Sequence, residues 1–376
     1  MKITTKIISL SIAAMSIAST LNAESLIDAF KDAKVSGVVQ AYNFAKQEVT
    51  GQEDYDITTL GLDLSYETAR FYNFGAKATF QAAASPWIDD DAEVGASGDM
   101  WGSGSVLSEM YISYKMANTT AQIGRMYVST PLVAGSGSRV NKEAFQGATF
   151  VNSDLPDTTL TLAFVNKFQA RTDSEGNIGT FEDINDDGAY TVSVKNKSVK
   201  DLTLTAAYLD SIDAFTTAYI EAGYKFNDFG LSAQYYNSEK EDADSTYLIG
   251  VRGTATFGPV DLLAAYVTVS DEAEVSPGLG NGADLAYTWS EIFSWQYRVD
   301  QDSYKVGAKY NINKNVNIGA SYVNEDAQNY TYAYTALIAS YTFTGELKGL
   351  SVYATYEIGS EDADQSGSRV KFNYAF

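Results

Sequence analysis

Polar and apolar residues alternate along the last ten residues of the chain, Gly367 to Phe376. Successive side chains of an extended chain point to opposite sides, so the two kinds of residue separate onto two faces. One face is largely aromatic and consists of Val370, Phe372, Tyr374 and Phe376. The other face is polar and consists of Arg369, Lys371 and Asn373. The pattern predicts a final β-strand with one apolar and one polar side.

Extended stretches of this kind recur along the chain, and we count eighteen of them. The breaks that follow even-numbered stretches are short, whereas four of the breaks after odd-numbered stretches are long: residues 86–104, 130–146, 169–187 and 271–301. A soluble β-protein gives no reason for this asymmetry. The predicted strands cover residues 34–46, 55–68, 74–85, 105–117, 120–129, 147–153, 158–168, 188–198, 201–211, 214–226, 229–238, 245–257, 259–270, 302–312, 316–324, 331–344, 349–359 and 367–376.

Strands with one apolar face, joined by alternating short turns and long loops, are typical of transmembrane barrels. Only helices and closed barrels pair all their backbone groups in lipid, and no segment after residue 23 has the apolar length of a spanning helix. We therefore predict an all-β fold, a transmembrane antiparallel β-barrel of about 18 strands. Such a barrel is too wide for side chains alone to fill. We expect the third loop, residues 130–146, to fold into the lumen.

The N-terminal residues predict the compartment. Lys2 and Lys6 precede an apolar run over residues 7–17 that ends near Ala23, which is the pattern of a cleaved signal peptide. An N-terminal membrane anchor is disfavoured because the run is short. We predict a signal peptide over 1–23 and a barrel over 24–376, with 24–34 as a short helical lead-in in the periplasm. The protein is then expected in the outer membrane of a Gram-negative bacterium.

Composition removes several classes of chemistry. The chain has no cysteine and no histidine, so thiolate sites, disulfides and imidazole-based triads are excluded. Without residues 1–23, the chain keeps 24 basic and 48 acidic residues, a net charge of −24. That charge argues against nucleic acid as a partner and predicts a preference for cations.

The segment from Gly124 to Phe150 carries a family resemblance. It contains, in order, Gly124-Arg125, Thr130-Pro131-Leu132, Arg139 and Phe145-Gln146-Gly147. This succession resembles the surroundings of the third loop in OprD-family porins and the related campylobacter-type major outer-membrane porins. Residues 286–291 also look like that group. The resemblance implies that the third loop forms the narrowest part of a channel and that the protein is a trimer.

The resemblance and the strand phase together give the candidate site residues. The predicted pore constriction consists of Arg125, Ser129, Thr130, Ser138 and Arg139. The family commonly has an acidic residue at the position of Ser138, so recognition of a carboxylate does not carry over directly. The predicted lumen-facing residues are Glu109, Lys115, Arg252, Lys305 and Lys309. Tyr374 and Phe376 are predicted to form the signal for assembly into the membrane.

An acidic segment matches half of a calcium loop. Asp183, Asn185 and Asp187 stand at the first, third and fifth positions, and Gly188 at the sixth. Val194 stands where a bidentate glutamate is needed, so an acidic surface turn is the competing interpretation. No cofactor is required by any other pattern.

These observations predict a porin, a water-filled channel for passive diffusion of ions and small hydrophilic solutes. A substrate-specific channel for small organic acids or amino acids is the alternative within the same class. An adhesin or an enzyme built on a barrel is the alternative of another class, and we expect no enzyme. The expected partners are membrane lipid and lipopolysaccharide, the assembly machinery and two further copies of the chain.

Overall fold

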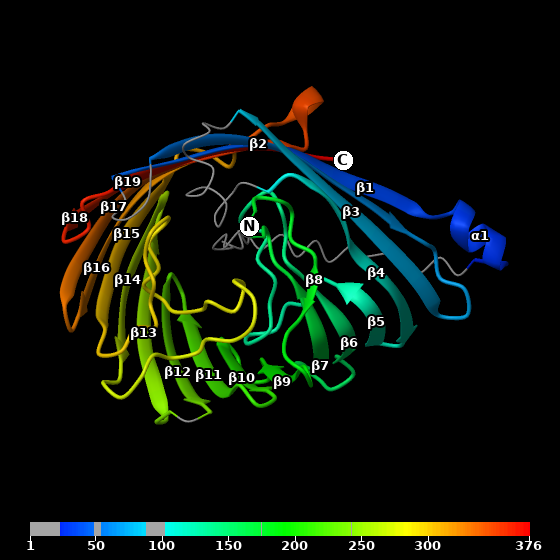
Figure 1. Ribbon diagram of the computed structural model, residues 1–376, viewed down its shortest axis with the longest axis horizontal. Helices are drawn as coiled ribbons and strands as arrows, with labels where there is room; N and C mark the ends of the chain where they lie inside the picture. The colour runs from blue at the N-terminus through cyan, green and yellow to red at the C-terminus, as the bar shows by residue number, and fades with distance from the viewer. Residues whose placement is uncertain (1–22, 49–53, 88–101, 174, 242) are drawn as a thin grey trace.

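A ring of antiparallel strands encloses a space into which long loops fold (Figure 1). The computed structural model describes residues 23–48, 54–87, 102–173, 175–241 and 243–376. The strands are β1 Lys34–Gln47, β2 Tyr55–Glu67, β3 Phe74–Trp87, β4 Gly104–Met116, β5 Thr119–Met126, β6 Ala144–Asn152, β7 Thr158–Gln169, β8 Phe181–Asp183, β9 Ala189–Asn196, β10 Leu202–Ser211, β11 Phe215–Phe226, β12 Phe229–Lys240, β13 Thr246–Phe257, β14 Val260–Val269, β15 Asp302–Asn311, β16 Val316–Ala327, β17 Tyr330–Thr342, β18 Leu350–Glu361 and β19 Ser366–Ala375.

The ring closes where the two ends of the chain meet. β1 pairs with β2 on one side and with β19 on the other, in register from Val38 opposite Ala375 to Gln47 opposite Ser366. β8 and β9 both pair with β7, so they form one strand interrupted by residues 184–188. The nineteen segments therefore occupy eighteen places, which confirms the predicted barrel.

Two errors of three residues in the predicted strand bounds lie on either side of the third loop. The chain leaves the wall after Met126, although residues up to 129 were predicted as strand, and re-enters it at Ala144 instead of residue 147. Met126 pairs with Phe145, and both side chains are buried at 2% and 0% exposure. An apolar pair inside the barrel thus closes the ladder, and the loop comprises residues 127–143.

The alternation seen in the sequence separates the outer from the inner face. Phe372 and Tyr374 of β19 are 45% and 44% exposed on the outer face, whereas Lys371 and Asn373 are buried inside. The inner face is not polar throughout, which corrects the simple expectation of a watery lumen. Near the starts and ends of β10 to β14 it carries buried apolar side chains: Leu209, Tyr219, Tyr236, Leu248 and Val267.

Two loops cover these inner surfaces. Loop 270–301 contributes Val275, Tyr287 and Tyr297 to the same buried cluster, and loop 127–143 contributes Leu132 and Val133. Burial of this apolar surface stabilises both loops within the barrel. The two loops lie inside the ring in Figure 1, as the yellow and cyan-green segments.

The N-terminal part begins with a short helix, α1, at Leu26–Lys31. The Ser25 hydroxyl caps it by accepting a hydrogen bond from the Asp28 amide at 3.1 Å. Residues 1–22 of the predicted signal peptide lie outside the described residues. One further short helix, η2, covers Gly345–Leu347 in the turn before β18. No helix in the described part of the chain is long and apolar enough to cross a membrane.

Candidate functional site

Loop 127–143 is fixed to the inner face of β1, β2, β3 and β19. Gln81 of β3 and Lys142 form a reciprocal pair: the Gln81 amide donates to the Lys142 carbonyl at 3.0 Å and accepts from the Lys142 amide at 2.7 Å. Lys142 also forms an ion pair with Asp63 of β2 at 2.6 Å. Lys371 of β19 donates to the Arg139 carbonyl at 3.2 Å. Buried polar side chains of the wall therefore satisfy the backbone of the loop.

The loop makes a tight turn of its own. Ser129 and Ala134 form an isolated antiparallel bridge. The Thr130 hydroxyl accepts a hydrogen bond from the Val133 amide at 2.9 Å and donates to its carbonyl at 3.0 Å. Thr130 is buried at 7% exposure, so its hydroxyl serves the turn, whereas Ser129 is exposed.

Loop 127–143 is also bonded to loop 270–301. Val133 and Leu279 form a parallel bridge, with the Ala134 amide donating to the Leu279 carbonyl at 3.0 Å and the Leu279 amide to the Leu132 carbonyl at 2.9 Å. A side chain at Gly280 would place Cβ 2.4 Å from the Ala134 carbonyl oxygen, and its φ is +78°. Only glycine fits this close approach. These bonds therefore join the two loops into one unit.

Glu143 is the polar centre of that unit. Its carboxylate accepts hydrogen bonds from the Ser136 amide at 2.8 Å and the Asn281 amide at 2.9 Å. The Asn281 side-chain amide donates to it as well. Arg171, from the segment after β7, pairs with it at 3.4 Å. One buried carboxylate thus joins three segments that are far apart in sequence.

Two guanidinium groups approach the hydroxyl of Ser138. Arg139 Nη1 donates to Ser138 Oγ at 3.4 Å, and Arg171 Nη2 donates to the same oxygen at 3.5 Å. Ser138 is exposed, whereas Arg139 is buried with its guanidinium 5.2 Å from the centre of the Phe44 ring. Ser138 therefore lies between the guanidinium groups of Arg139 and Arg171. Arg171 was not predicted from the sequence.

Arg125 does not join this group. It pairs directly with Met110, and residues directly opposite each other in an antiparallel pair share a face. Met110 and Ile123 are 55% and 66% exposed on the outer face. The Arg125 guanidinium lies 4.3 Å from the centre of the Phe181 ring, and Nε donates to Gln146 at 3.4 Å. This placement contradicts the predicted position of Arg125 in the pore.

The five residues predicted to face the lumen lie at strand positions whose side chains point to the inner face. Two of them contact loop 270–301: Arg252 lies 4.1 Å from the centre of the Tyr287 ring, and Lys305 donates to the Trp289 carbonyl at 2.7 Å. Lys309 pairs with Asp261 at 3.0 Å, and Glu109 pairs with Lys77 at 2.6 Å. Lys115 lies on the same face as the buried Ser113.

The residues of the half calcium loop form the interruption between β8 and β9. The Asn185 side-chain oxygen accepts from the Asp187 amide at 3.2 Å and from the Gly188 amide, while its nitrogen donates to the Ile212 carbonyl at 3.0 Å. Asp183 pairs with Lys167 at 2.8 Å. Among the described residues, no group of three or more acidic side chains could hold a metal ion. Calcium binding stays a prediction.

The barrel and its inner loops are similar to solved structures. Acinetobacter baumannii OccAB1 matches with a TM-score of 0.80 at 15% identity, over 95% of this chain and 99% of that one. Pseudomonas aeruginosa OccK8 (OprE) matches with a TM-score of 0.78 at 14% identity, over 93% and 99%. At such identity the likeness shows the fold. No curated protein matches the chain in sequence.

A family model decides the identity. The model of the outer membrane porin OprD family matches residues 94–301, more than half of the chain. The chain belongs to the OprD family. As an OprD-family porin it is a channel, not an enzyme, in the outer membrane of a Gram-negative bacterium. The resemblance expected from the third loop is thereby confirmed.

The Asp284 carboxyl gives this OprD-family porin a predicted pH dependence. Burial and the nearby Glu143 carboxylate raise the pKa of Asp284 to about 7, against the opposing effect of Arg171. An aspartate in an unfolded chain has a pKa of ~4. Between that pH and 7, the folded protein therefore holds a proton that the unfolded chain has released. The free energy of unfolding falls as the pH rises through this window. We expect Asp284→Asn to raise the melting temperature in detergent at pH 8 and leave it unchanged at pH 4. An equal change at both pH values would contradict this assignment.

Proposed function

We propose that this porin passes small hydrophilic solutes and ions by passive diffusion, and that loops 127–143 and 270–301 together form its narrowest part. The observation that carries the proposal is the bonding of both loops to the inner wall and to each other, through Gln81, Lys142 and the Val133–Leu279 bridge. A loop held in this way sets a fixed size limit. Charged groups at its surface replace part of a solute's hydration shell and bias the sign of what passes.

The charges around loop 127–143 support a preference for carboxylate-bearing solutes. The described bases there are Arg139, Lys142, Arg171, Arg369 and Lys371. The described acids there are Asp63 and Glu143, each in an ion pair, and Asp284, whose raised pKa leaves it partly protonated at neutral pH. The net charge of −24 predicted cation preference, but charge far from the constriction is screened over about 8 Å at physiological ionic strength. We therefore propose that the local bases, with Arg139 and Arg171 near Ser138, determine selectivity.

Arg139→Gln tests this selectivity. In a planar bilayer under a KCl gradient, we expect the reversal potential of the wild type to have the sign that chloride permeation gives. The reversal potential of the variant should shift toward the value for potassium, because one positive charge is lost at the constriction. Arg125→Gln is the matched control, since it removes the same charge from the outer face, and it should shift the potential little. A wild-type potential on the potassium side would favour the expectation from net charge and reject the carboxylate preference.

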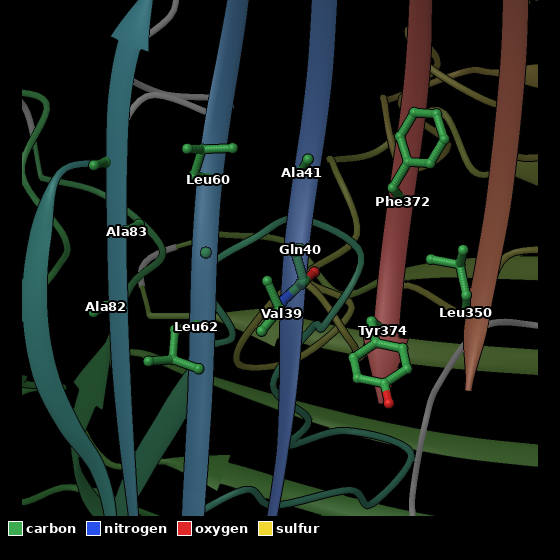
Figure 2. A pocket seen from close by; sticks show the side chains of 12 residues that line it. Val39, Gln40, Ala41, Leu60, Leu62, Ala82, Ala83, Leu350, Phe372 and Tyr374 are labelled. Carbon is green, nitrogen blue, oxygen red and sulfur yellow. The ribbon is translucent and has the colours of Figure 1, made fainter. Parts of the chain in front are cut away.

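We also propose that the porin is a homotrimer, assembled through the outer face of β1 to β5. Arg125 on that face would be costly against lipid. β5 has eight residues, fewer than the roughly 9–11 that a tilted strand needs to cross the hydrocarbon. A shallow groove of about 460 Å³ lies nearby, lined by small residues such as Ala41, between Leu60 and Phe372, and Ala82, beside Leu62 (Figure 2). β1 and β4 are three of the eighteen places apart in the ring, so their outer faces differ in direction by about 60°. In a three-fold ring, the directions from one copy to its two neighbours differ by the same angle.

Filling the groove tests the assembly. Ala41 lies directly opposite Leu60 and Phe372, so Ala41→Trp should block a docked copy and convert trimer to monomer. The mass of the detergent-purified particle, measured by light scattering, reports the change. Ala206→Trp, on the outer face of β10, is the control and should leave the trimer intact. A monomeric wild type, or a trimeric Ala41→Trp variant, would contradict the proposed interface.

A further inference from the structure

A single wall carboxylate holds the second half of loop 270–301. Glu357 of β18 is 0% exposed. Its carboxylate accepts hydrogen bonds from the Ser290 hydroxyl at 2.8 Å and from the backbone amides of Glu291 at 2.7 Å, Ile292 at 3.0 Å and Phe293 at 3.1 Å. Four donors from one short stretch of the loop thus converge on one side chain.

This arrangement depends on the negative charge of Glu357. Hydrogen bonds from backbone amides to a carboxylate are charge-assisted and stronger than neutral ones. The Ser290 hydroxyl also accepts from the Phe293 amide at 3.2 Å and the Ser294 amide at 3.0 Å, so the carboxylate and the hydroxyl together close a turn. A glutamine in this place would present an amide nitrogen, a donor, to groups that are themselves donors. Loss of the carboxylate would leave buried amides unsatisfied.

Other wall residues contact the same stretch through fewer described hydrogen bonds. Arg369 donates to the Glu291 carbonyl at 2.6 Å, and Tyr353 donates to the Glu291 carboxylate at 3.1 Å. Further along the loop, the buried Glu325 of β16 accepts from Gln296 at 2.6 Å. Glu357 therefore holds the backbone amides of residues 291–293 and the Ser290 hydroxyl, while its neighbours hold a carbonyl group and side chains beside them.

If Glu357 released residues 290–293, their movement would reach loop 127–143. Residues 275–282 of the same loop bond to loop 127–143 through the Leu279 and Asn281 contacts. The stretch held by Glu357 lies between that contact and the return of the chain to the wall at β15. Residues 282–289 join the two contacts, so we expect motion of residues 290–293 to reach the constriction along this segment.

We propose that Glu357 is the positioning residue of the constriction: its carboxylate fixes loop 270–301 in the lumen and so keeps the size of the opening constant. This inference rests on the proposed function, in which the two loops form the narrowest part of the channel. Glu357 itself lies behind the loop and is buried, so it acts through residues 290–293 and not by touching solute.

Single-channel recording of Glu357→Gln tests the proposal. We expect the variance of the open-channel current to rise several-fold and the mean conductance to change, because the loop moves on the time scale of the recording. Asp261→Asn is the matched control. Asp261 is another inward carboxylate of the wall, bonded to Thr256, Lys309 and Asn311, and its described contacts include no residue of loops 127–143 and 270–301. Its variant should remain as quiet as the wild type.

A conservative replacement separates positioning from general stability. Glu357→Asp keeps a carboxylate at the place in the wall that faces the amides of residues 291–293. We expect its channel to be quieter than that of Glu357→Gln under the same conditions, because the negative charge that attracts these amides is kept. Equal noise in Glu357→Gln and the wild type, or equal noise in Glu357→Gln and Asp261→Asn, would overturn the proposal. A folded wild type that carries no current would instead reject the proposed function.

Discussion

The structure depends on the requirement that every backbone polar group within the bilayer is paired. The ladder between β1 and β19 meets this requirement, because it turns an open sheet of strands into a ring without edges. Closure fixes the alternation of side chains, so that Phe372 and Tyr374 meet lipid while Lys371 and Asn373 point inward. The apolar outer band, the inner charges and the width that loops must fill are consequences of that ring.

The interior solves a second pairing problem. Two long loops lie in the lumen, and their backbone groups would remain unsatisfied against an apolar wall. The wall supplies polar partners where the loops touch it, such as Gln81 for Lys142 and Glu357 for residues 290–293. Where the wall is apolar, as at Tyr219 and Leu248, the loops bring Tyr287 and Tyr297 to cover it. The two loops are therefore a packed part of the fold.

Much of the barrel was predictable because its strands obey a period of two that lipid and water impose. All eighteen places were found from alternation and turn residues, and the terminal strand was found nearly to the residue. The facing of Arg125 was not predictable, because the strand ends there and its phase depends on the pairing with Met110. The partners of Glu143 and Glu357 were also hidden, since Asn281 and Ser290 are distant in sequence. Burial of loop 270–301 was not predicted, although residues 286–291 were noted as part of the family resemblance.

The central claim is that loop 127–143 lines the path of ions, and chemical modification of Ser138→Cys tests it most directly. The chain has no other cysteine, so a charged thiol reagent acts at this position alone. We predict that the current through the labelled channel falls promptly, whereas labelling of Ile123→Cys on the outer face leaves it unchanged. A channel fully labelled at residue 138, as verified by mass, that conducts as before would contradict the account.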